Sequence, residues 1–223
     1  MVIQDNLKHI KSNLPDHVTL VAVSKTKSVS EIMEAYYVGQ RIFGENKIQE
    51  MVDKYEQMPK DIEWHMIGHV QSNKVKYMAH FVSLIHGVDN FKLLNEINKQ
   101  AQKHHRIINC LLQIKIAEED SKFGMTANQA SDILKSNDFS ELKNLCVLGV
   151  MGMATFTEDQ NQIKKEFDFL KSTFDSLKPL QSFNFKPKTI SMGMSGDYQL
   201  AITCGSNMIR VGSSIFGERN YQN

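Results

Sequence analysis

The sequence predicts an α/β fold: a single-domain (β/α)8 TIM barrel with an extra N-terminal helix. Eight short apolar runs alternate with stretches of helical periodicity along the 223 residues, and such alternation is typical of a parallel sheet. Eight strand–helix units in a chain of this length indicate a compact barrel. A doubly wound open sheet is the alternative. No GxGxxG motif follows the first apolar run, which disfavours a dinucleotide-binding sheet of that kind.

The N-terminal helix is predicted by an amphipathic pattern. Ile3, Leu7, Ile10 and Leu14 lie on one helical face with charged and amide residues between them. We therefore expect one domain over residues 1–223, with this helix in residues 1–17 and the barrel in residues 18–219.

The predicted strands are the apolar runs, and a helical pattern follows each except the last. The runs span residues 18–25, 41–46, 63–69, 83–89, 108–116, 145–153, 188–194 and 208–214. Ser28 with Glu31 resembles a capping box and marks the start of the helix after the first strand. Helical periodicity is clearest in two sets of apolar residues: Leu93, Leu94, Ile97 and Ala101, and then Ile163, Phe167, Leu170, Phe174 and Leu177.

Composition narrows the class of protein. A net charge of +1 with 23% charged residues gives no basic or acidic excess, so we expect neither nucleic acid nor an anionic membrane as partner. The cysteines, Cys110, Cys146 and Cys204, lie far apart in apolar segments without a CxxC pair, which predicts reduced, buried thiols in a cytoplasmic protein. We find no signal peptide and no apolar run of about 18 residues that could span a membrane.

Polar residues gather where the predicted strands end, and the active sites of barrels lie at that end. Lys25 ends the first strand, Glu45 and Asn46 end the second, and His69 follows the third. After the last two strands come glycines and serines, which supply backbone N–H groups and hydroxyls to an anion. These are Ser191, Gly193, Ser195 and Gly196, and then Gly212, Ser213 and Ser214. They predict a phosphate site, and a pair of ordinary glycine-containing turns is the alternative.

Lys25 shares one strand face with Val21 and Val23, because side chains alternate along a strand. If the two valines face the barrel interior, Lys25 lies at its mouth. A desolvated lysine has a lowered pKa and can act as a neutral nucleophile towards a carbonyl group. Lys27 has the same parity but lies past the strand, so we expect it to be solvated or an accessory charge.

Arg210 has the parity of Met208 and Gly212, and we expect it in the barrel interior. A buried guanidinium needs an acceptor, either a carboxylate such as Glu45 or the ring of a bound ligand. His65 and His69 are four residues apart without a third ligand, so we predict no metal site.

The remaining polar candidates are expected at the surface. His104 and His105 end a polar helix and should be solvated. Residues 118–124 should form a solvated loop over the mouth of the barrel, with Lys122 able to reach a site.

Six segments, in the same order, resemble the signature segments of the pyridoxal phosphate homeostasis proteins (the YggS/PROSC family). They are "AVSKTK", "FGEN", "WHMIGHVQSNK", "DSKFGM", "SMGMSGD" and "IRVGSSIFG". The resemblance runs from about residue 18 to residue 219 and implies a barrel similar to the N-terminal domain of alanine racemase. It also implies pyridoxal 5′-phosphate (PLP) held as an aldimine, a Schiff base, on Lys25.

The resemblance further assigns a cofactor-binding role to residues around Lys25. Phosphate contacts are implied for Ser191, Met192, Gly193, Ser195, Gly212 and Ser213, a place near the pyridine nitrogen for Arg210, and places near the cofactor for Asn46 and His65. Two positions depart from the family. Many members have proline or another residue where His69 stands, which leaves its role open, and threonine where Ser213 stands, which also carries a hydroxyl.

Chemistry favours a carrier over an enzyme. The Arg210 side chain can only donate hydrogen bonds. Next to the pyridine nitrogen it therefore favours an unprotonated PLP ring, which withdraws electrons less strongly. Alanine racemase adds a second domain and a tyrosine from the partner subunit, whereas this sequence ends soon after Gly212. We therefore expect a monomeric PLP carrier or buffer without catalytic residues or metal, which acts in vitamin B6 and amino-acid homeostasis and supplies apo-enzymes. The alternatives are a racemase-like PLP enzyme and a Schiff-base lysine aldolase that binds a sugar phosphate.

Overall fold

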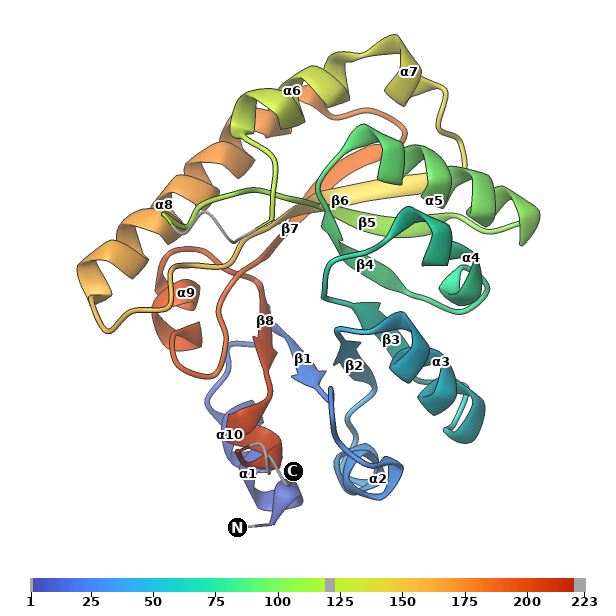
Figure 1. Ribbon diagram of the computed structural model, residues 1–223. Helices are drawn as coiled ribbons and strands as arrows, with labels where there is room; N and C mark the ends of the chain where they lie inside the picture. Colours follow the sequence, from blue (N-terminus) through green and yellow to red (C-terminus); the bar gives the residue numbers. More distant parts are fainter. Residues whose placement is uncertain (1, 119–122, 219–223) are drawn as a thin grey trace.

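Eight parallel strands form a closed barrel in sequence order in the computed structural model, which describes residues 2–118 and 123–218 (Figure 1). Strand β1 pairs with both β2 and β8, which closes the barrel. The predicted (β/α)8 barrel is confirmed, and the open-sheet alternative is wrong. The strands are β1 (Thr19–Val23), β2 (Ile42–Glu45), β3 (Glu63–Met66), β4 (Leu84–Val88), β5 (Ile108–Gln113), β6 (Leu145–Met151), β7 (Phe185–Ser191) and β8 (Met208–Val211).

Helices surround the barrel, as the alternating pattern predicts (Figure 1). The residues of α5 and α8 with helical periodicity are buried. Ser28 and Glu31 form the predicted capping box at the start of α2. The helices are α1 (Ile3–Ser12), α2 (Val29–Tyr37), α3 (Ile48–Gln57), α4 (Val75–Met78), α5 (Phe91–Lys103), α6 (Ala127–Lys135), α7 (Asn137–Ser140), α8 (Gln160–Leu177), α9 (Tyr198–Thr203) and α10 (Ser213–Phe216), with 3-10 turns η1 (Ser72–Lys74) and η2 (Lys178–Leu180).

Each strand ends one to three residues before the predicted end of its run. Strand β1 ends at Val23, so Lys25 lies in the turn beyond it and not within the strand. Strand β7 begins at Phe185, earlier than the predicted residue 188. Lys186 is exposed at this end of β7, so its start lacks the apolar pattern of a buried strand.

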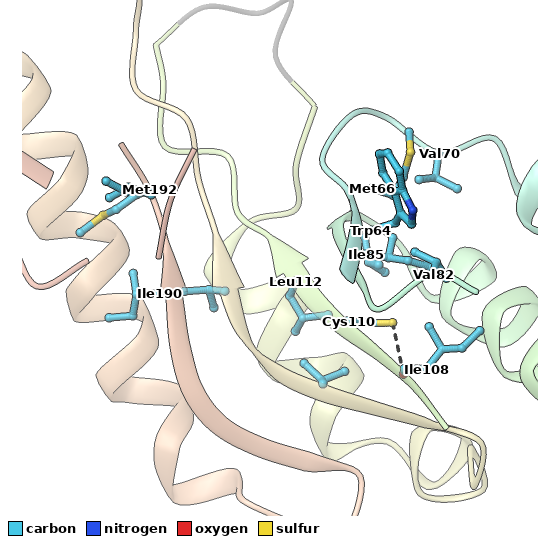
Figure 2. Close-up of a cluster of buried hydrophobic side chains, with 14 of the residues drawn as sticks. Trp64, Met66, Val70, Val82, Ile85, Ile108, Cys110, Leu112, Ile190 and Met192 are labelled. Carbon is cyan, nitrogen blue, oxygen red and sulfur yellow. Dashed lines mark hydrogen bonds between the residues drawn. The ribbon is translucent and has the colours of Figure 1, made fainter. Parts of the chain in front are cut away.

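Two apolar clusters lie on the two faces of the barrel wall. The larger fills the layer between strands and helices, and Figure 2 shows part of it around Trp64. The smaller joins side chains from strands around the whole barrel, which can meet only in its interior. It contains Val21, Val23, Ile67, Leu84, Leu111, Met151 and Met208. The prediction that Val21 and Val23 face the interior is therefore confirmed.

The described residues contain no helix long and apolar enough to cross a membrane. They also contain no group of three or more side chains that could hold a metal ion. Cys110, Cys146 and Cys204 are free and buried, as predicted, and burial raises the pKa of the Cys110 thiol.

A glycine in β6 fixes the local shape of the barrel wall. The pairing of β6 with β7 shifts register between Val147 and Gly149, where Gly149 has a φ of 147°. A Cβ at this position would lie 1.9 Å from the carbonyl oxygen of Thr189. We expect Gly149→Ala to lower the free energy of unfolding by about 3 kcal/mol, measured by urea denaturation. Gly196→Ala is the control, because an added Cβ would meet nothing within 4 Å; equal losses in both variants would contradict this explanation.

Candidate functional site

The segments after β7 and β8 lie in direct contact at the carboxyl end of the barrel. The backbone N–H of Arg210 donates to the carbonyl of Gly193 over 3.0 Å, and that of Gly212 donates to the Ser195 hydroxyl over 3.1 Å. Gly193 has a φ of 96°, and an added Cβ would lie 2.6 Å from the Cβ of Ala201 in α9. Only glycine therefore lets α9 pack against this segment.

Helix α10 begins immediately after Gly212, at Ser213. The first N–H groups of a helix have no intrahelical acceptor, so those of Ser213 and Ser214 are available to an anion. Together with Ser195 they form a group of neutral donors of the kind that holds phosphate. The structure thus brings the two predicted phosphate segments together.

Arg210 lies in the barrel interior, as its parity predicts, and is 3% exposed. Its Nη1 donates to Ser191 Oγ over 2.6 Å and its Nη2 to the carbonyl of Gly152 over 3.0 Å. Burial lowers the pKa of Arg210 to about 10, which still leaves it charged at neutral pH. A guanidinium has five N–H donors, and the described residues provide hydrogen-bond acceptors for two of them.

The predicted alternative of a salt bridge from Arg210 to Glu45 is wrong. Ile42 packs against the interior cluster, and a Cβ on Gly44 would lie 2.9 Å from Val21. Alternation then turns Glu45 outward, where Lys54 of α3 binds it over 2.8 Å.

His86 of β4 is a buried residue of the site that the sequence analysis did not predict. Its Nδ1 lies 3.0 Å from Ser191 Oγ and its Nε2 lies 3.1 Å from Nδ1 of His65 on β3. Burial lowers the pKa of His65 to about 3 and that of His86 well below its usual value, so both rings are neutral. The signal was present in the sequence, because His86 has the parity of the interior residue Leu84.

Lys25 lies in a tight turn at the end of β1. The N–H of Lys27 donates to the carbonyl of Ser24 over 3.1 Å, and Thr26 has a φ of 65°. A β-branched residue in this conformation is strained, and such strain clusters at functional sites. Lys25 itself is half-buried.

Charged side chains hold the residues on both sides of Lys25. Ser24 Oγ donates to Glu45 over 2.6 Å, and the N–H of Thr26 donates to Glu50 over 2.5 Å. Lys54 joins the two carboxylates, at 2.8 Å from Glu45 and 2.7 Å from Glu50, and donates to the carbonyl of Ser24 over 2.8 Å. We call Ser24, Glu45, Glu50 and Lys54 the Lys54 cluster. It ties the Lys25 turn to α3.

The other predicted site residues, Asn46, Ser191 and Met192, lie in three different surroundings. Asn46 follows β2 directly and is half-buried. Its side-chain amide makes no hydrogen bond with the part of the protein that the structure describes, so the amide is available to a ligand. Ser191 is fully buried, and its hydroxyl is hydrogen-bonded to Arg210 and His86. The Met192 side chain packs in the outer core (Figure 2), and the structure does not bring it to the site.

Lys27 is not solvated, contrary to one of its two predicted interpretations. Its side chain is 13% exposed, and Nζ donates to the carbonyl of Phe216 over 2.9 Å. A cation suits the carbonyl end of a helix, so Lys27 fixes α10 next to the Lys25 turn.

His65 and His69 do not form a pair. His69 lies beyond the end of β3, exposed and stacked on Phe123 at 4.1 Å between ring centroids. His104 and His105 are exposed, as predicted. Lys122 lies outside the described residues.

Known proteins are similar to this chain in sequence and in fold. The family model for the alanine racemase N-terminal domain matches residues 2–220. The pyridoxal phosphate homeostasis protein of Pasteurella multocida is 38% identical over 99% of both chains. That of Escherichia coli K12 is 35% identical over 93% of this chain and 88% of its own.

Solved structures agree with the sequence comparisons. PipY of Synechococcus elongatus, solved with PLP bound, has a TM-score of 0.87 and 31% identity over 96% of this chain and all of its own. Alanine racemase of E. faecalis has a TM-score of 0.72 at 14% identity and shares the fold; this chain covers 59% of its length. The chain therefore belongs to the pyridoxal phosphate homeostasis protein family, whose barrel is the alanine racemase N-terminal domain.

Proposed function

We propose that this protein binds PLP at the carboxyl mouth of the barrel and serves as its carrier or buffer in vitamin B6 and amino-acid homeostasis. The observation that carries the proposal is Arg210. It is a buried cation without a salt bridge among the described residues, and three of its five donors have no acceptor there. A ligand that offers an acceptor to Arg210 and an anion to the neighbouring segments fits this arrangement. The name of the relatives and the PLP-bound PipY structure support PLP as that ligand.

The residues present fit each part of the cofactor. Lys25 would hold it covalently through its amine, with Asn46 and His65 as further proposed neighbours. The Ser195 hydroxyl and the N–H of Ser213 would bind its phosphate, with Gly212 as a proposed neighbour whose own N–H holds the Ser195 hydroxyl. The positive φ of Gly193 shapes that segment.

The position of Arg210 favours a protein that binds the cofactor over an enzyme that converts amino acids. PLP supplies an aldehyde that combines with amines and a ring that withdraws electrons from them. Arg210 would donate to the pyridine nitrogen and leave it unprotonated, which weakens that withdrawal. We therefore assign no residue a catalytic role.

The remaining proposals concern the state and partners of the protein. The groups that would hold the cofactor all come from one chain, which supports a monomer. Free, buried cysteines support a cytoplasmic location, where apo-enzymes that need PLP would receive it.

Spectroscopy and cofactor transfer test this function. The protein is incubated with PLP, freed of excess by gel filtration, and its visible absorbance is recorded. We expect one cofactor per chain and recovery of activity when an apo PLP enzyme is added. The same sample is incubated with amino acids in deuterated water, where we expect no more α-proton exchange than free PLP causes. Exchange above that level would favour the racemase-like enzyme, and a colourless protein that binds a sugar phosphate would favour the aldolase.

A further inference from the structure

Four buried side chains cross the barrel interior in one hydrogen-bonded chain. Arg210 of β8 contacts Ser191 of β7, Ser191 contacts His86 of β4, and His86 contacts His65 of β3. All four are at most 3% exposed. Because buried donors and acceptors must be satisfied within such a chain, the position of each proton can be worked out from one end.

Arg210 sets the donor-to-acceptor direction of these hydrogen bonds. Arginine only donates, so Ser191 Oγ is the acceptor of that hydrogen bond. The Ser191 hydroxyl must then donate its own proton, and His86 Nδ1 is the acceptor within reach among the described residues. His86 therefore carries its proton on Nε2 and donates it to Nδ1 of His65. His65 in turn carries its proton on Nε2.

The opposite direction leaves a buried group unsatisfied. If His86 donated from Nδ1, Ser191 would accept twice, and its own proton would lack an acceptor among the described residues, which is costly in a buried site. A doubly protonated His86 would place a second cation in the same hydrogen-bonded network as Arg210. Burial disfavours that charge, because it lowers the pKa of His86. The neutral, one-directional arrangement is thus the one that satisfies each contact.

His65, the last residue of this hydrogen-bonded series, reaches the amino-terminal mouth of the barrel. His65 lines a cavity of about 380 Å³ there, together with residues at the starts of several strands. These include Thr19 of β1, Glu63 of β3, Leu84 of β4 and Asn109 of β5. The chain therefore runs from Arg210 towards the amino-terminal mouth, where the remaining Nε2 proton of His65 can meet solvent.

We propose that His86 is a positioning residue of the cofactor site, which acts on Arg210 through Ser191. By accepting the Ser191 proton, His86 turns a lone pair of Ser191 towards Nη1 and fixes which guanidinium donors stay free for the ligand. This inference rests on the proposed function, since the ligand of Arg210 is taken to be PLP. Without His86, the Ser191 hydroxyl rotates freely and Arg210 loses a fixed acceptor.

Histidine tautomers test the direction of the chain without the cofactor. The full chain, labelled with 15N in its histidines and freed of PLP, is measured by long-range 1H–15N NMR. We expect His86 and His65 both as the Nε2–H tautomer. A proton on Nδ1 of His86 would overturn the proposal, whether or not the protein binds PLP.

Cofactor release tests the effect on Arg210. His86→Phe should speed release of PLP into an apo-enzyme trap by about tenfold, equivalent to about 1.4 kcal/mol. His86→Asn keeps an acceptor for Ser191 and should restore release to near the wild-type rate, and His9→Phe on exposed α1 is the control. The double variant His86→Phe, Arg210→Ala should release PLP no faster than Arg210→Ala alone.

Two results would overturn this part of the proposal: unchanged release in His86→Phe, or effects of His86→Phe and Arg210→Ala that multiply. If His86→Phe does not fold, the tautomers of the wild-type protein decide. A wild-type protein that retains no PLP would refute the proposed function and leave the tautomer result as a separate finding.

Discussion

Lys25→Ala is expected to abolish covalent retention of PLP, because the methyl group of alanine cannot combine with an aldehyde. Reduction with borohydride followed by peptide mass spectrometry should find the cofactor on the Lys25 peptide of the wild-type protein and on no peptide of the variant. The visible absorbance of the lysine-linked cofactor should disappear with it. Binding through the phosphate and Arg210 should persist in weakened form, measured by equilibrium dialysis.

Two further variants test whether attachment needs the amine of Lys25 itself, and not merely a positive charge at that position or the neighbouring Lys27. Lys25→Arg keeps a cation but offers no neutral amine at neutral pH, and it should also fail to retain the cofactor. Lys27→Ala removes the contact with Phe216 and leaves Lys25 in place, so the label should remain on Lys25. A label on another lysine in the Lys25→Ala protein would show that the turn after β1 is not the attachment point.

Strand parity made much of the barrel interior predictable. Alternation places Val21, Val23 and Arg210 on the inner face, and the structure confirms all three. The same rule separates the side chains of two neighbouring candidates. Ser191 and Met192 are neighbours in the chain, so they point to opposite faces of the wall, and only Ser191 joins Arg210.

The Lys54 cluster could not be predicted, because it depends on packing between distant segments. Lys54 lies on a helix rich in polar residues, where a lysine is typically solvated. It becomes buried because the Ser24 turn and the end of β2 meet on α3. The fold class follows from local periodicity, whereas this burial follows from where the loops of two strands come to lie.

Lys54→Met is expected to destabilise the protein by about 3–5 kcal/mol at neutral pH, the usual effect of removing one partner from a buried ion pair. The Lys54 and Glu45 side chains are 7% and 0% exposed, and one oxygen of Glu45, Oε2, already lacks a hydrogen-bond partner. The variant leaves the Glu45 carboxylate buried without a counter-charge. It also releases the carbonyl of Ser24, so the Lys25 turn should loosen and PLP should be released faster. Urea unfolding and the release assay measure the two effects.

The loss should depend on pH in a defined direction. Burial raises the pKa of Glu45 above the ordinary value of 4.5, and Lys54 opposes that rise. A carboxyl whose pKa is raised by folding favours the folded state fully below its ordinary pKa, and this contribution is lost as pH rises through the folded value. Removing Lys54 raises the folded pKa of Glu45 further. The difference between variant and wild type should therefore be small below pH 4.5 and grow towards neutral pH.

An exposed ion pair provides the matched control. Lys164 and Asp168 on α8 form an i,i+4 pair at 2.5 Å with side chains 56% and 50% exposed. Lys164→Met should leave stability unchanged within error at every pH, because solvent screens such pairs. The double variant Lys54→Met, Glu45→Gln removes the buried charge together with its partner and should lose the pH dependence seen in Lys54→Met. A loss in Lys54→Met that stays constant from acid to neutral pH would show that Lys54 acts through packing, and that the Glu45 charge does not hold the Lys25 turn.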